Sequence, residues 1–122
     1  MQQHFFTSNI IEALHDADII LIPGYIPFGQ DLGIYKAELR TIAYQNCLYV
    51  GMCNRVGTED GMEYLGKSIL AGPDGEIITE GSNNSELVVC KVDLADIRNK
   101  RNQNPYFTLR RPDEYLHIIK HV

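Results

Sequence analysis

An unbroken apolar run from Leu48 to Cys53 places the strongest limit on what this chain can fold into. The run contains no charged or amide side chain, and it carries the β-branched Val50. A strand with one face in water would alternate polar and apolar residues, so this run predicts a strand covered on both faces. Such a strand belongs inside a layered fold.

Strand and helix patterns alternate on the N-terminal side of this run. Residues 19–22 are a second apolar run, which we expect to be a buried strand that stops at Pro23-Gly24. Residues 34–46 place apolar side chains at helical spacing, and Asn46 is expected as the C-cap. The alternation predicts an α/β fold, with strands of mixed direction in one sheet and helices on one face.

Turn signals and shorter patterns divide the rest of the chain. Strands are expected at 68–73 and 76–80, joined at Asp74-Gly75, because glycine adopts a positive φ without steric cost. The other expected elements are a short helix near 10–14, a loop at 25–33, a polar loop at 56–63, a last strand at 86–92 and a helix at 94–102 capped by Asp93. We expect one unit over residues 1–102. Residues 103–122 would form an arm that packs on a partner subunit, and a frayed tail explains them equally well.

Composition excludes several classes of function. The net charge is -5 and Lys and Arg form no large cluster, so nucleic-acid binding is not expected, because phosphate affinity needs a basic field. No apolar run approaches the ~20 residues of a membrane span, so no membrane partner is expected. The N-terminus lacks the pattern of a signal peptide. Three cysteines, an odd number, favour free thiols and a cytoplasmic location.

The order and spacing of several motifs resemble those of the nitrilase, or carbon–nitrogen hydrolase, superfamily. The motifs are A-Y-Q-N at 43–46, Y-V-G-M-C-N-R-V-G at 49–57, E-Y-L-G-K-S at 63–68, G-P-D-G-E-I-I at 72–78, V-D-L-A-D-I-R at 92–98 and R-R-P-D-E-Y at 110–115. The chain looks most similar to the amidase and N-carbamoyl-amino-acid hydrolase branch, partly through Pro23-Gly24-Tyr25.

The resemblance implies a fold and a chemistry. The fold would be the C-terminal half of an α-β-β-α sandwich, in which two sheets stack face to face. The chemistry would use a Cys nucleophile, a Glu general base and a Lys that stabilises the tetrahedral intermediate. In the family these three residues precede the matched region, and the nucleophile would fall at or just before Met1. We therefore expect no catalytic residue within this chain, no cofactor and no metal.

The resemblance also implies a pocket wall in the loop after Pro23. Tyr25 and Ile26 occupy positions that flank the nucleophile and contact substrate in the family, although a packing role for Tyr25 is also open. N-carbamoyl-amino-acid hydrolases tend to have a polar residue where this chain has Ile26, which argues against that substrate class. Asn54 is a weaker substrate-binding candidate, and so is Glu63.

Other reactive side chains favour structural roles. Cys47 would follow a helix C-terminus, whose dipole raises the pKa of a thiol, and Cys90 would lie in mid-strand. Cys53 has the cation of Arg55 near it in sequence and is the one thiol worth testing for reactivity. His117 and His121 have the i, i+4 spacing of metal ligands, but no third ligand is evident, so a solvated tail is the favoured interpretation.

Two functions from different classes follow from these patterns. The first is the C-terminal part of a hydrolase of non-peptide carbon–nitrogen bonds, acting on a small linear amide or N-carbamoyl compound and inactive without its N-terminal part. The second is a non-catalytic remnant that acts as an oligomerisation or interaction module. In either case half a sandwich exposes an apolar sheet face, so the chain is expected to be a homo-oligomer or to pair with an N-terminal half.

Overall fold

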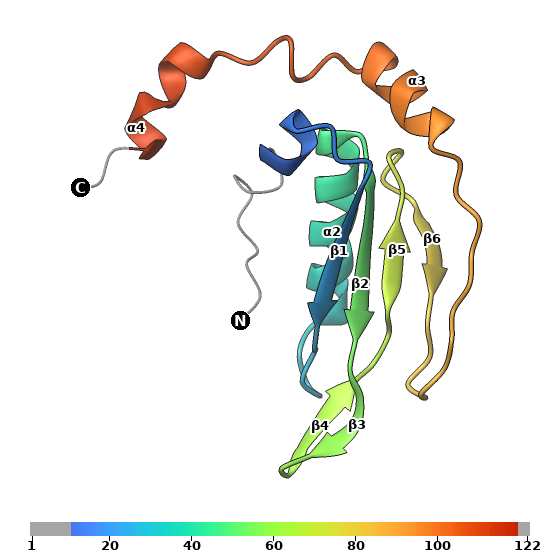
Figure 1. The fold of residues 1–122 in the computed structure, drawn as a ribbon. Coiled ribbons are helices and arrows are strands. Elements are labelled where there is room, and N and C mark those ends of the chain that lie inside the picture. The colour runs from blue at the N-terminus through green and yellow to red at the C-terminus, as the bar shows by residue number, and fades with distance from the viewer. Residues whose placement is uncertain (1–10, 120–122) are drawn as a thin grey trace.

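A mixed four-stranded sheet forms the centre of the chain (Figure 1). The structure is a computed structural model, and it describes residues 11–119. The strands are β1 (Ile19–Gly24), β2 (Tyr49–Asn54), β5 (Ile69–Ala71) and β6 (Ile77–Glu80), in the order β1-β2-β5-β6. The β1–β2 pair is parallel, whereas β2–β5 and β5–β6 are antiparallel. The predicted α/β class with strands of mixed direction is confirmed.

Helix α2 (Leu32–Asn46) covers one face of this sheet and forms the core with it (Figure 1). Leu39 and Ala43 of the helix are buried in one cluster with Val50 and Met52 of β2. The helix begins two residues before the predicted start, because the side chain of Asp31 accepts a hydrogen bond from the N–H of Gly33 at 2.9 Å.

The helix ends differently from the prediction. Asn46 was expected as the C-cap, but it is the last helical residue, and its buried side chain donates a hydrogen bond to the carbonyl of Ile42 at 2.9 Å. Cys47 is the cap, and its φ of 50° lies in the left-handed region. Strand β1 also differs, because it continues through Pro23 and Gly24 instead of stopping there. β1 is an edge strand, where proline is tolerated.

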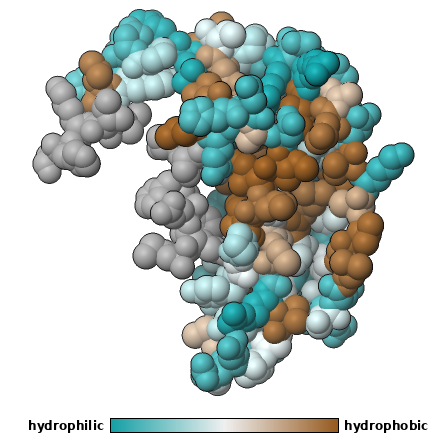
Figure 2. Space-filling view, in the orientation of Figure 1, coloured by the Kyte–Doolittle hydropathy of each residue, from teal (hydrophilic) through white to brown (hydrophobic). Residues whose placement is uncertain are grey.

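Within residues 11–119, no helix covers the other face of the sheet around Leu21 and Gly51. Alternation along β1 turns Leu21 away from α2, and 76% of its surface is exposed. A Cβ built on Gly51 would lie 3.1 Å from Leu21 and 3.5 Å from Leu70, so these residues share that face. We call it the bare face. Figure 2 shows apolar side chains gathered over the strands on this side.

Residues 56–65 form a β-hairpin where the sequence predicted a polar loop at 56–63. Strands β3 (Val56–Glu59) and β4 (Met62–Leu65) pair antiparallel in a separate two-stranded sheet. Asp60 and Gly61, between them, have φ values of 53° and 77°. Positive φ at both central residues matches the twist of a tight hairpin, and Asp-Gly is a common sequence for it. Asp60-Gly61 is therefore the local sequence signal that would have predicted this hairpin.

Residues 86–92 do not form the predicted last strand. Residues 86–91 of this segment are exposed, Val92 is half-buried, and the segment pairs with no strand among residues 11–119. Leu87 and Val89, which gave the strand pattern, are exposed rather than buried. Cys90 is likewise exposed and not in mid-strand as expected. An apolar run becomes a strand only where a neighbour accepts its backbone hydrogen bonds.

The C-terminal part of the chain runs across one end of the sheet (Figure 1). Helix α3 (Ala95–Gln103) begins after Asp93, whose side chain accepts a hydrogen bond from the N–H of Ala95 at 2.9 Å. An arm then leads to the 3-10 helix η1 (Pro112–Tyr115) and to α4 (Leu116–Ile119). The short helix near the N-terminus is seen at residues 11–14, and its start lies outside the described residues. Within residues 11–119, no helix combines the length and apolarity needed to cross a membrane.

Candidate functional site

The candidate site lies at the carboxyl ends of the parallel strands β1 and β2. The last residues of these strands, Gly24 and Asn54, are partners across the sheet. The chain leaves β1 at Tyr25 and passes beside the β3–β4 hairpin. The N–H of Leu65 donates to the carbonyl of Ile26 at 2.8 Å, and the N–H of Phe28 donates to that of Glu63 at 2.8 Å. Carboxyl ends of strands are the usual place for ligands in α/β folds.

Tyr25 supplies an exposed ring at this end of the sheet. About half of its surface is accessible, at 45%. Its ring meets that of Tyr64 edge to face, with the centroids 5.7 Å apart. The guanidinium of Arg55 lies 5.4 Å from the centre of the Tyr64 ring and is also bonded to Glu59 at 2.5 Å. Tyr25, Tyr64 and Arg55 therefore form a continuous surface, which we call the aromatic wall.

Tyr64 and Arg55 were not among the predicted site residues. Both lie in motifs that carried the family resemblance, Tyr64 in E-Y-L-G-K-S and Arg55 in the N-R-V-G segment. Their place in these motifs linked both residues to the family but did not place them near Tyr25. Only the β3–β4 hairpin, which the sequence analysis missed, brings them to Tyr25.

Ile26 and Asn54 lie beneath the surface at the same place. Ile26 has no exposed surface, and it belongs to the core cluster with Met52. Asn54 is 7% exposed, and its amide donates to the carbonyl of Lys67 at 3.2 Å. Its backbone N–H donates to the hydroxyl of Ser68 at 2.9 Å. The Oδ1 atom of Asn54 is buried and has no hydrogen-bond partner among the described residues. Asn54 thus fixes the turn at 66–68 against the end of β2.

Glu63, the weaker candidate, is exposed on β4. Its carbonyl holds the loop after Ile26 through the bond from Phe28 described above. This contact uses the backbone alone, so the position of Glu63 beside the loop does not depend on its carboxylate.

The three cysteines are free thiols in different surroundings. Cys47 is buried, and burial raises the pKa of its thiol, while the charges of Arg101 and Lys100 partly oppose that rise. The predicted direction is confirmed, but its main cause is burial rather than the helix dipole. Cys53 is exposed at the end of β2 on the bare face, and Arg55 is engaged with Glu59 instead of with this thiol. No cysteine hydrogen-bonds a Glu or Lys side chain within residues 11–119.

The part of the chain that the structure describes contains no cluster of side chains that could hold a metal ion. No group of three or more His, Cys, Asp or Glu side chains comes together there. His117 is exposed at the start of α4, and His121 lies outside the described residues. The favoured interpretation of these two histidines, a solvated tail, therefore stays a prediction.

The family model and the similar proteins of known sequence all belong to one group of hydrolases. The family model described as carbon-nitrogen hydrolase matches residues 2–102. A nitrilase of Pyrococcus abyssi is 38% identical over 108 residues, which cover 85% of this chain and 39% of that protein. An N-carbamoylputrescine amidase of Arabidopsis thaliana is 34% identical over 121 residues, which cover 87% of this chain and 40% of that protein.

A solved structure shares the fold over nearly the whole chain. The carbon-nitrogen hydrolase of Helicobacter pylori superposes with a TM-score of 0.85 at 23% identity, over 96% of this chain and 46% of that protein. At this identity the likeness supports the fold alone. The chain spans about two fifths of the length of the sequence relatives that it matches.

Proposed function

Because the chain belongs to the carbon–nitrogen hydrolase family, we propose that it forms the C-terminal part of a hydrolase of small linear amides or N-carbamoyl compounds. The Cys nucleophile, the Glu base and the Lys would come from residues outside this sequence. A thiolate would attack the carbonyl carbon, the carboxylate would move protons, and the ammonium would stabilise the oxyanion.

The bare face is the observation that carries this proposal. It carries the large apolar side chains of Leu21 and Leu70, and Leu21 is exposed. The sequence of β2 is that of a strand covered on both sides, yet Cys53 is exposed on this face. A second sheet laid on the bare face would supply the missing layer and place its own residues at the carboxyl ends of β1 and β2. The aromatic wall lies at the same ends.

The three predicted substrate-binding residues receive different roles in this proposal. Tyr25 would contact the substrate directly, because its ring is exposed beside Tyr64. Ile26 and Asn54 would position the wall from below, since both are buried. Asn54 acts through its bonds to Lys67 and Ser68, which hold the turn that follows the hairpin.

A chimera tests the proposal. The N-terminal portion of the Pyrococcus abyssi relative, up to the residue that aligns before Ile11, would be fused to residues 11–122 of this chain. Ammonia release would be measured with aliphatic amides and with N-carbamoylputrescine. We expect hydrolysis by the chimera, none by either portion alone, and a fall of at least tenfold in kcat/KM for Tyr25→Ala. Alanine in place of the relative's nucleophile is the inactive control.

The result that would overturn the proposal is a folded but inactive chimera. Circular dichroism and a cooperative thermal transition would establish folding. A chimera that folds, covers the bare face and hydrolyses none of these compounds would favour the alternative, a non-catalytic module that retains the assembly surface. Alkylation of Cys53 reports coverage directly, because a sheet laid on the bare face would protect this thiol.

Two further expectations belong to the same proposal. We propose that the assembled protein is a homo-oligomer in which the arm at 103–122 packs on a partner subunit. We also propose a cytoplasmic location, which the three free thiols support. Sedimentation of the chimera and imaging of the tagged protein in its source cell test these points separately.

A further inference from the structure

A pocket of 640 Å³ lies at the opposite end of the sheet from the aromatic wall. It is an open pocket, lined by the C-terminal half of α2, by the turn at Asp74-Gly75 and by the arm around residues 106–115. The turn joins β5 to β6, and β5 runs antiparallel to β2, so the turn lies beside the start of β2. Its lining includes residues of the motifs A-Y-Q-N, G-P-D-G-E-I-I and R-R-P-D-E-Y, but the proposed function assigns it no ligand.

Two arginines from different elements line the pocket. The Nε of Arg40, on α2, donates to the carbonyl of Gly75 at 2.6 Å. The Nε of Arg110, on the arm, donates to the carbonyl of Phe107 at 3.1 Å, and its guanidinium lies 5.9 Å from the centre of that ring. Both guanidinium groups are thus oriented through one nitrogen. Within residues 11–119 neither forms an ion pair with a carboxylate.

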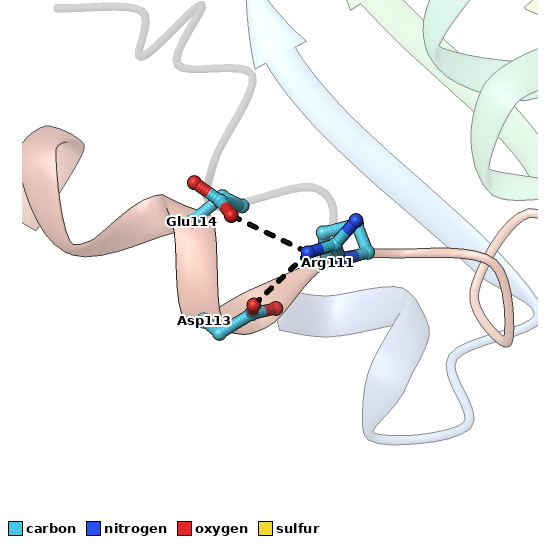
Figure 3. Close-up of polar contacts among 3 residues, drawn as sticks. All are labelled: Arg111, Asp113 and Glu114. Atoms are coloured by element: carbon cyan, nitrogen blue, oxygen red, sulfur yellow. Dashed lines mark hydrogen bonds and ion pairs between the residues drawn. The ribbon is translucent and has the colours of Figure 1, made fainter.

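The neighbouring cations show that this lack of a carboxylate is specific to the pocket. Arg111, next to Arg110 in sequence, contacts the carboxylates of Asp113 at 3.2 Å and Glu114 at 3.3 Å (Figure 3). Asp74, the acidic residue of the pocket, is already paired with Lys100. The pocket therefore holds two arginines that form no ion pair within residues 11–119, and the carboxylate that lines it, that of Asp74, is paired with Lys100.

The rest of the lining is aromatic. The hydroxyl of Tyr106, on the arm, donates a hydrogen bond to the hydroxyl of Tyr44, on α2, at 3.3 Å, and the centroids of the two rings are 6.1 Å apart. Phe107 and Tyr115 add two more rings from the arm. Flat apolar walls with guanidinium groups suit a ligand that has a planar body and a carboxylate, because guanidinium matches the carboxylate in shape and charge.

We propose that this pocket binds a small aromatic carboxylate, held by Arg40 and Arg110 through its charge and by the tyrosine and phenylalanine rings through its body. The site is separate from the aromatic wall, so it would bind its ligand whether or not the chain takes part in amide hydrolysis. Binding would also tie the arm to α2, because the two arginines come from these two segments.

Benzoate is the probe that tests the site. It would be titrated into the full 122-residue chain while amide chemical shifts are followed by NMR. We expect saturable binding with shifts at Arg40, Gly75 and Arg110. Arg40→Gln and Arg110→Gln should each weaken binding about fivefold, because each removes a charged hydrogen-bond partner at a partly exposed site. Arg111→Gln is the matched control and should change the dissociation constant less than twofold.

Two measurements on the unaltered protein keep the proposal open to contradiction even if a variant fails to fold. Benzyl alcohol, which has the ring without the charge, should bind at least fivefold more weakly than benzoate, and inorganic phosphate should also bind more weakly because it lacks the ring. Tyr25→Ala should leave benzoate binding unchanged. Absence of saturable benzoate binding, equal binding of benzyl alcohol, or an equal loss in Arg111→Gln would each overturn the proposal.

Discussion

Gly66 lies where three segments of the chain meet. Its φ is +70°, and its N–H donates to the carbonyl of Arg55 at 3.1 Å. A Cβ at this position would lie 2.8 Å from the side chain of Val56 and 2.9 Å from the carbonyl oxygen of Ser82. Only glycine fits both the backbone conformation and the space. The turn that Asn54 holds at 66–68 therefore depends on this residue.

Replacing Gly66 by alanine should lower the free energy of unfolding by about 3 kcal/mol, since the left-handed backbone and the clash both oppose the methyl group. Gly57→Ala is the matched control. Gly57 has a φ of +85° but no atom within 4 Å of a built Cβ, so we expect a loss of about 1 kcal/mol from the backbone alone. Urea unfolding measures both. Equal losses would show that the space around Gly66 relaxes without cost.

The cysteines should differ in their reaction with iodoacetamide at pH 8. Burial excludes the reagent from Cys47 and raises the pKa of its thiol, so the reactive thiolate is scarcer there than at an unperturbed thiol. The rate at Cys47 should rise with pH only above the ordinary thiol range, while the exposed Cys53 and Cys90 react first. Mass spectrometry of the peptides measures the order, and all three should react alike in urea. Fast labelling of Cys47 in the folded chain would contradict this prediction.

At the scale of elements, the start of α2 sets the geometry of the loop that leaves β1. Asp31 accepts the hydrogen bond from Gly33 and begins the helix before the apolar pattern does. Asp31→Ala should therefore lower the free energy of unfolding by about 1 kcal/mol, because an N–H at the helix start loses its partner. Asp31→Asn keeps an acceptor oxygen and should lie within about 0.5 kcal/mol of the unaltered chain. Thermal unfolding compares them, and equal effects would argue against a capping role.

At the scale of the whole molecule, the bare face governs association. Leu21, on the edge strand β1 of this face, is 76% exposed, so a charge there should cost little folding free energy but should oppose contact with another apolar face. We expect the isolated chain to self-associate in sedimentation experiments, and Leu21→Lys to weaken that association at least fivefold.

Met62→Lys is the control for this experiment. Met62 is 47% exposed, but it lies on β4 in the separate hairpin, away from the bare face. Its replacement should leave the association constant within a factor of about two. A compact, cooperatively unfolding monomer at all concentrations would contradict the importance of the bare face. An equal effect of the two substitutions would show that net charge, rather than this face, controls association.

Local side-chain patterns were enough to predict most of the elements of the central sheet and its helix. The apolar runs of β1, β2, β5 and β6 and the periodicity of α2 follow from side-chain spacing. Gly75 adopts the positive φ expected of the hairpin turn, at 77°. All the motifs that carried the resemblance, except R-R-P-D-E-Y at 110–115, lie within residues 2–102, which the family model matches. These predictions succeeded because each depends on neighbours within a few residues.

Which apolar runs pair with a neighbouring strand, and which distant side chains come into contact, depends on the folded chain as a whole. Residues 86–92 have a strand pattern but pair with no strand in the described chain, and residues 86–91 stay exposed. The β3–β4 hairpin carries Tyr64 to Tyr25, and the arm carries Arg110 to the pocket that Arg40 lines. Contacts between residues tens of positions apart depend on chain closure and packing, which no local pattern encodes.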